Sequence, residues 1–221
     1  MSAVARESYP YLGVGLAVAA VAGALGFPYL CAGGVLLSGF VAYFFRDPAR
    51  VVPAEPDVMV SPGDGKVVEV RKLPGEAGTL VAIFLSLFDV HINRAPVAGR
   101  VRRVDYRPGR FLPANLSRAA RENERNDLLL EGDCGEVKLS QIAGVVARRI
   151  VCWKKEGDRV DRGERIGLIQ FGSRLEVVLP PHARPEVVVG SRVQGGTSIL
   201  ARISVGKPHE EEKQLAPATT R

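Results

Sequence analysis

The stretch DVMVSPGDGKVVEVRKLPGEAGTLVAIFLSLFDVHI, residues 57–92, decides the fold class. Its short runs of Val, Ile and Leu are separated by Gly, Pro and Asp, a pattern typical of strands joined by tight turns. Similar runs continue to about residue 205. The sequence therefore predicts a mainly β, α+β domain with the texture of a β-sandwich of the hammerhead type. Carrier domains of that type present a modified Lys, usually in a Met-Lys pair, and the chain has no such pair.

A long uncharged stretch precedes this domain. Arg6 and Glu7 are the only charged residues among the first 45, and the tripeptide GFP at 26–28 divides the uncharged residues into two apolar runs. Each run is close to the minimum of about 17 residues for a bilayer span, and their Gly and Ala content allows two helices to pack closely. We expect a membrane-associated helical hairpin over residues 1–45, with a buried hairpin of the soluble domain as the alternative.

The distribution of charge predicts the location of the chain in the cell and its orientation at the membrane. Arg6 precedes the uncharged stretch, and Arg46 and Arg50 follow it. If the hairpin spans a bilayer, the positive-inside rule places both of its ends in the cytoplasm. We therefore expect the protein at the cell membrane with its globular domain on the cytoplasmic side. Three cysteines without paired or metal-ligand spacing are consistent with a reducing compartment.

The remaining composition describes one basic globular domain. The chain of 221 residues has a net charge of +6, all of it beyond the neutral hairpin. We expect a catalytic domain over 46–206 and a flexible tail over 207–221. Five arginines form a basic run: Arg100, Arg102, Arg103, Arg107 and Arg110. The run either attracts anionic lipid headgroups or is a solvated strand face. Nucleic-acid binding is not expected, because no basic motif is interleaved with aromatic residues.

The dipeptide Gly172-Ser173 lies between two apolar runs. A Gly-Ser pair in such a place is usually only a turn. The alternative is chemical, with the Ser173 hydroxyl attacking the carbonyl carbon of Gly172. That attack needs a nearby base to take the hydroxyl proton.

Three histidines are candidates for this base. We expect His182 in an exposed turn and His209 in the polar tail, whereas His91 ends an apolar run two residues after Asp89. In a strand, the two-residue period would place Asp89 and His91 on one face, where the carboxylate can orient the imidazole. Asp64 lies in a tight turn and matters only if folding brings it to His91. No metal site is expected, because Asp-x-His supplies only two ligands.

Three motifs occur in order along the chain: SPGDG at 61–65, FDVHINRAP at 88–96 and FGSR at 171–174. Together they resemble the phosphatidylserine decarboxylase proenzyme family in its short form. Three supporting phrases also match that family: FFRDP at 44–48, ENERN at 122–126 and QIAG at 141–144. The resemblance runs from about residue 44 to about residue 180.

The resemblance implies a self-processing enzyme. Cleavage between Gly172 and Ser173 would give a β chain, 1–172, and an α chain, 173–221, that remain together. Ser173 would become a pyruvoyl group, the covalent cofactor, with neither metal nor PLP. The amine of phosphatidylserine would form a Schiff base with it, and loss of CO2 would yield phosphatidylethanolamine.

The resemblance also implies roles for individual residues. Asp64, His91 and Ser173 match the family's relay for self-cleavage, and Asp89 is the other candidate for orienting His91. A better known branch of the family has a second histidine where this chain has Arg94. We therefore assign His91 to both proton transfers, in self-cleavage and in decarboxylation.

Two other functions remain open at this point. One is decarboxylation of a related lipid such as archaetidylserine, and the other is a non-catalytic, membrane-anchored β-domain that binds lipid or a partner. The expected partners are the phospholipid substrate, the membrane and, as a possibility, further copies of the chain in a homo-oligomer.

Overall fold

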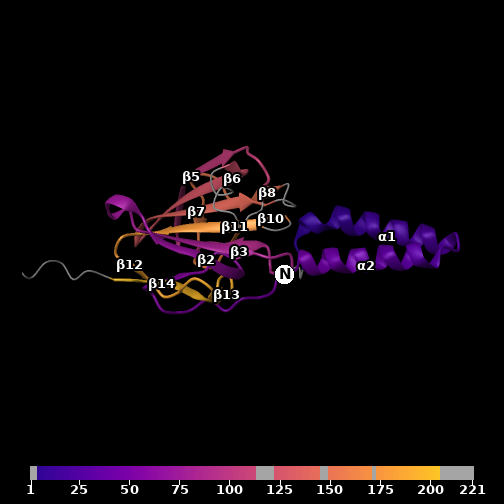
Figure 1. Cartoon of the computed structure of the whole chain (residues 1–221), viewed down its shortest axis with the longest axis horizontal. Coiled ribbons are helices and arrows are strands. Elements are labelled where there is room, and N and C mark those ends of the chain that lie inside the picture. Colours follow the sequence, from indigo (N-terminus) through magenta and orange to yellow (C-terminus); the bar gives the residue numbers. More distant parts are fainter. Residues whose placement is uncertain (1–3, 113–121, 145–148, 171–172, 205–221) are drawn as a thin grey trace, which may run out of the picture.

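The protein is a β domain with a pair of helices projecting from one end (Figure 1). The computed structural model describes residues 4–112, 122–144, 149–170 and 173–204. Gly172 and the tail expected over 207–221 lie outside these residues. The prediction of a mainly β fold with an N-terminal helical hairpin is confirmed.

The hairpin follows a single 3-10 turn, Arg6–Ser8, and comprises α1 (Tyr9–Ala24) and α2 (Pro28–Phe44). Proline is well suited to the first turn of a helix, where its missing N–H has no helical partner, and both helices carry one there. Gly26 connects them with a φ of 77°. The predicted division at 26–28 is therefore confirmed.

Small residues let the two helices approach closely. A Cβ on Gly34 would lie 3.0 Å from the Cβ of Ala19 and 3.1 Å from the carbonyl oxygen of Gly15. The large apolar side chains point away from the contact and are exposed, among them Val14, Leu16, Val21, Leu25, Phe27, Tyr29, Leu36 and Leu37. Among the residues described, no helix combines the length and hydropathy of a candidate membrane span.

The strands form three sheets in which every paired neighbour is antiparallel. The eight-stranded sheet has the order β13-β2-β3-β11-β7-β6-β5-β9. Its strands are β2 (Gly65–Lys72), β3 (Thr79–Leu85), β5 (Gly99–Arg107), β6 (Arg125–Gly132), β7 (Gly135–Ala143), β9 (Arg159–Val160), β11 (Ser173–Leu179) and β13 (Arg192–Val193). The two smaller sheets are β4 (Ile92–Arg94), β10 (Arg165–Ile169) and β8 (Ile150–Cys152), and β1 (Val58–Val60), β14 (Ile199–Ile203) and β12 (Ala183–Pro185).

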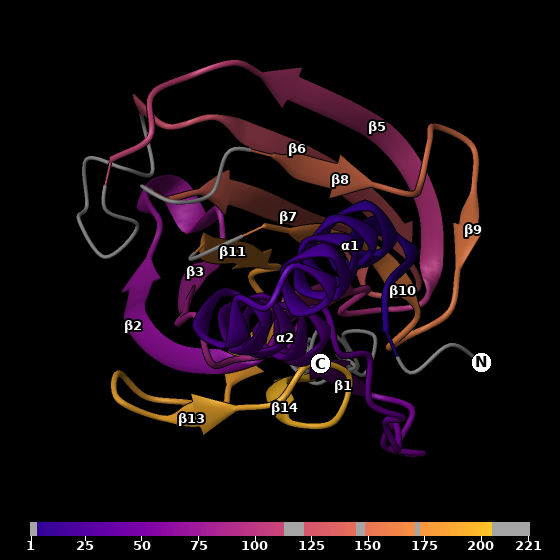
Figure 2. The ribbon, with the colours of Figure 1, turned by 90° about the vertical axis from the view of Figure 1, so that its right-hand side faces the viewer.

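The large sheet curls around the hydrophobic core, as the view along the hairpin shows (Figure 2). Its central strands, β3 and β11, are buried along almost their whole length. Valine, isoleucine and leucine side chains from all three sheets fill the interior. β3 is almost entirely apolar, whereas β11 carries Arg174 and Glu176, which are buried as an ion pair.

A second, smaller apolar cluster attaches the hairpin to the domain. Phe44 and Phe45 at the end of α2 pack with Val90, Ile92 and Leu168. The backbone also joins here, because the N–H of Ala5 donates to the carbonyl of Phe45 at 2.8 Å. The base of the hairpin therefore packs against β4 and β10, beside the loop that carries His91.

Candidate active site

Ser173 is the first residue of β11, in the middle of the large sheet. It pairs with Leu85 of β3 on one side and with Ala143 of β7 on the other. The residue is fully buried, and its Oγ has no hydrogen-bond partner among the residues described. An unsatisfied buried hydroxyl is unfavourable, so such groups usually need an explanation in function.

His91 lies between β3 and β4, in the segment that follows Leu85. Its Nδ1 is 3.0 Å from the backbone carbonyl oxygen of Asp89. A carbonyl only accepts hydrogen bonds, so Nδ1 carries the proton and Nε2 is the basic nitrogen of the neutral ring. Burial lowers the pKa of His91 from 6.5 to about 4, although the bond to Asp89 opposes the shift. The ring is therefore neutral near pH 7 and suited to accept a proton.

The sheet pairing brings His91 and Ser173 to the same end of the sheet. Leu85, which pairs with Ser173, is the last residue before the segment that holds His91. On the other side, the N–H of Ile169 donates to the carbonyl of His91 at 3.4 Å, just ahead of the cleavage motif. Both chain segments that carry the predicted chemistry therefore meet here.

The structure gives Asp89 a different contact from the one expected. Residues 86–91 form a turn between β3 and β4 rather than a strand, so the two-residue period does not apply. The Asp89 carboxylate accepts from the N–H and Oγ of Ser86, at 2.8 and 2.7 Å, and from Arg192 at 2.8 Å. The carboxylate closes the turn, and the backbone carbonyl of Asp89 is what meets the imidazole. The prediction of a strand at these residues is wrong, and a role for Asp89 in orienting His91 stays a prediction.

Asp64 is held at the start of β2 by two other partners. Its Oδ2 accepts from Arg50 at 2.7 Å, and its Oδ1 accepts from the N–H of Gly195 at 2.8 Å. These contacts join the linker after the hairpin to the loop before β14. A role for Asp64 in orienting His91 stays a prediction.

The hairpin contributes directly to the surroundings of His91. The ring of Phe44 lies 4.1 Å from the imidazole, centre to centre, at an angle of 33°. Phe44 is fully buried, so it shields one face of the histidine from water. Nearby, Arg46 donates to the carbonyl of Phe88 at 2.7 Å and helps to fix the turn before His91.

Comparison with known proteins decides the family. Residues 37–201 match the sequence profile of the family described as phosphatidylserine decarboxylase. The chain belongs to that family. It is 45% identical over 210 residues to the curated phosphatidylserine decarboxylase proenzyme of Beijerinckia indica subsp. indica, covering 91% of this chain and 90% of the relative.

Arg94 occupies the position of the second histidine in another branch of the family. In this chain it connects separate segments of the structure. It is buried, and it donates to Asp47 at 3.2 Å, to the carbonyl of Pro48 at 3.3 Å and to the carbonyl of Gly163 at 3.0 Å. Asp47 also pairs with Arg165 at 2.6 Å. The guanidinium therefore fastens the linker after the hairpin to β4 and β10.

A buried chain of side-chain amides was not identified from the sequence as part of the site. Asn126 donates to Gln141 at 2.9 Å, Gln141 donates to Asn93 at 2.7 Å, and Asn93 donates to the carbonyl of His91 at 3.3 Å. The chain links the backbone at His91 to β6 and β7. Its signal was the presence of all three residues in the phrases that match the family.

Phe44 was also not identified from the sequence as part of the site, although it begins the FFRDP phrase.

The described residues contain no group of three or more His, Cys, Asp or Glu side chains placed to hold a metal ion.

Proposed function

We propose that the chain is a self-processing phosphatidylserine decarboxylase. The observation that carries the proposal is the buried Oγ of Ser173, which has no hydrogen-bond partner among the described residues and begins a central strand at the end of the sheet where His91 lies. A binding module has no use for an unsatisfied buried hydroxyl at the same end of the sheet as a neutral buried imidazole. Membership of the decarboxylase family supports the same activity.

Self-cleavage uses the chain's own atoms. Nε2 of His91 takes the proton of the Ser173 hydroxyl as Oγ attacks the carbonyl carbon of Gly172. The peptide C–N bond breaks, an ester to Oγ forms, and the nitrogen of residue 173 gains a proton. Loss of the α proton of residue 173 then breaks the Cβ–Oγ bond, expels the Gly172 carboxylate and leaves dehydroalanine. Water hydrolyses the imine tautomer of that residue, ammonia leaves, and the pyruvoyl group remains. His91 is neutral near pH 7, which is the form that accepts a proton, although its lowered pKa also makes the ring a weaker base.

The surroundings of Ser173 fit the group that cleavage leaves there. As the first residue of β11 it becomes the end of a new chain, and its neighbours in β3 and β7 hold it in place. A pyruvoyl group at this position supplies an electrophilic carbonyl that binds the substrate amine and accepts electrons as CO2 leaves. We assign the proton delivered to the product to Nε2 of His91.

The hairpin suits a lipid substrate. Its outer surface is apolar from Tyr9 to Tyr43, and no charged side chain interrupts it. Such a surface favours insertion among lipid chains. We propose that it holds the catalytic domain at the cytoplasmic face of the cell membrane, where the substrate resides.

Denaturing electrophoresis tests self-cleavage. We expect the wild-type chain to give two fragments, 1–172 and 173–221, the smaller blocked at its N-terminus and reactive with hydroxylamine. Ser173→Ala should give one intact chain. Ser204→Ala, which changes an exposed serine of the same fragment, should be cleaved as the wild type is. A wild-type chain that stays intact after long incubation, with no carbonyl-reactive fragment, would refute the proposal.

Flotation with vesicles tests the hairpin separately. The full chain should rise with vesicles of phosphatidylcholine and phosphatidylglycerol and resist extraction by high salt, because its attachment is apolar. Recovery in the unbound fraction would contradict the assignment to the membrane without affecting self-cleavage.

A further inference from the structure

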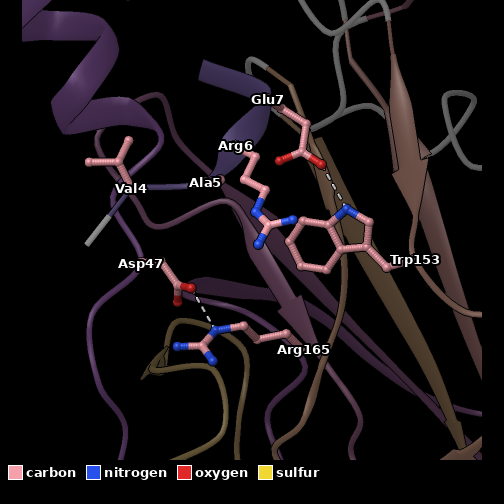
Figure 3. A pocket seen from close by; sticks show the side chains of 7 residues that line it. All are labelled: Val4, Ala5, Arg6, Glu7, Asp47, Trp153 and Arg165. Carbon is pink, nitrogen blue, oxygen red and sulfur yellow. Dashed lines mark hydrogen bonds and ion pairs between the residues drawn. The ribbon is translucent and has the colours of Figure 1, made fainter. Parts of the chain in front are cut away.

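A pocket lies at the base of the hairpin, between the segment before α1 and strands β8 and β10 (Figure 3). It encloses about 410 Å³. Its polar lining consists of Arg6, Glu7, Asp47, Trp153 and Arg165. None of these side chains was assigned a role in catalysis above, so the pocket needs its own explanation.

The carboxylates of the pocket are already engaged. Glu7 accepts from the indole N–H of Trp153 at 2.7 Å. Asp47 is shared between Arg165, at 2.6 Å, and Arg94, at 3.2 Å. Together with Arg94, which contacts Asp47, the pocket has three guanidinium groups and two carboxylates.

Arg6 is the cation left to meet a ligand. Its side chain is exposed and makes no hydrogen bond or ion pair with the residues that the structure describes. A guanidinium group binds phosphate oxygens through two parallel hydrogen bonds. A ligand with a single negative charge, such as a phosphodiester, would balance the charge excess.

The location indicates where such a phosphate comes from. Arg6 is only three residues before the start of the exposed apolar surface, which begins at Tyr9, with an exposed fraction of 54%. Trp153 is 38% exposed, and tryptophan is enriched at the level of lipid headgroups. If the hairpin inserts among lipid chains, the pocket faces the headgroup layer.

The basic run predicted from the sequence is less suited to this role. It lies on β5 and in the loop after it, and several of its members already pair with carboxylates: Arg102 with Glu131, Arg103 with Asp105, Arg107 with Asp127. The three arginines are exposed on a strand face, which is the alternative that the sequence left open.

The pocket includes Arg165, at the opposite end of β10 from the residue that contacts the backbone of His91. Arg165 begins β10, whereas Ile169, which meets the carbonyl of His91, ends it. Four residues of strand span about 13 Å. Only a few covalent bonds separate the amine from the phosphate in phosphatidylserine, so we assign a phosphate in this pocket to a lipid other than the one that reacts at Ser173.

We propose that this pocket binds the phosphate of a second, non-reacting anionic phospholipid, which seats the base of the hairpin in the membrane. The inference rests on the proposed membrane association. It adds a lipid site, distinct from the substrate site, to a region where the catalytic loop and the hairpin meet.

Trp153 provides the test, because it is the single tryptophan of the chain. The full-length Ser173→Ala chain, in a neutral detergent, is titrated with dihexanoyl phosphatidylglycerol while Trp153 emission is recorded. We expect a saturable change. Replacing Arg6→Gln in that chain should raise the half-saturating concentration about tenfold or more, since a charge-assisted hydrogen bond is lost.

Arg184→Gln is the matched control, because it removes an exposed arginine on β12. It should leave the titration unchanged. The proposal is overturned by the absence of saturation, by an equal effect of the two arginine variants, or by an equal response to dihexanoyl phosphatidylcholine. An equal response to inorganic phosphate would also overturn it, because that indicates a site for free anions. The titrated chain cannot cleave itself, so these results are independent of the decarboxylase proposal.

Discussion

Protonation of His91 should destabilise the folded chain by a predictable amount. Burial lowers its pKa from 6.5 to about 4. Between these values the unfolded chain binds a proton that the folded chain does not, so stability rises with pH across the window. Conversely, this contribution is lost as the pH falls from about 6.5 towards 4. At about 1.4 kcal/mol per pKa unit, the free energy involved is about 3 kcal/mol.

The measurement compares two uncleavable chains. Ser173→Ala and the double variant Ser173→Ala/His91→Asn are unfolded with guanidinium chloride at pH 7 and at pH 4, and Trp153 emission follows the transition. The single variant should lose about 3 kcal/mol more than the double variant between the two pH values. Carboxylates common to both chains cancel in this comparison.

The control replaces a different histidine. His182 is exposed in the turn before β12, so Ser173→Ala/His182→Asn should keep the pH dependence of the single variant. If the chain without His91 lost as much stability as the chain that retains it, the argument that a neutral, buried imidazole occupies this site would be refuted.

Three further predictions concern the same region. The rate of self-cleavage of the wild type should stay constant as the pH falls from 7 to 5 and should fall to half near the pKa of His91, about 4. Gel densitometry measures this rate. A half-maximal rate near pH 6.5 would exclude the buried ring as the base. Phe44→Ala should cost about 3–5 kcal/mol of stability and, by admitting water to His91, raise the pH of the half-maximal rate, whereas Leu36→Ala, on the exposed face of the same helix, should do neither. Arg94→Ala should lower the free energy of unfolding by about 3 kcal/mol, measured in guanidinium chloride, and Arg94→Lys should recover only part of it, because one ammonium group cannot replace a forked guanidinium; full stability of the alanine variant would contradict the structural role of Arg94.

Local sequence patterns were sufficient to predict the elements of the fold. The absence of charged residues from 8 to 45 predicted the hairpin, and the GFP tripeptide predicted its turn, because a helix and a turn both depend on neighbouring residues. Such local patterns could not predict the order of strands in the large sheet. β11 pairs with β3, far away in sequence, and this choice depends on how complete apolar faces fit together.

The site illustrates the same limit at the level of single residues. His91 and Ser173 were identified from their motifs, and the pairing of β11 with β3 brings their segments to one end of the sheet. The error over Asp89 arose from extending a strand into residues 86–91, where Ser86 and the carboxylate of Asp89 instead stabilise a turn. Phe44 was not identified because a ring contact between a helix end and a distant loop leaves no periodic signal.

The position of β11 determines what a cut at its first residue does to the molecule. The fragment after the cut supplies β11, β13 and β14, which pair with β3 and β7, with β2 and with β1 of the fragment before it, and β12, which pairs with β14. The products are therefore woven together, and separating them requires dismantling the central sheet. With the proposed cut, maturation would be an irreversible change of covalent structure within an intact fold, and the two fragments would have to be made as one chain to become entwined.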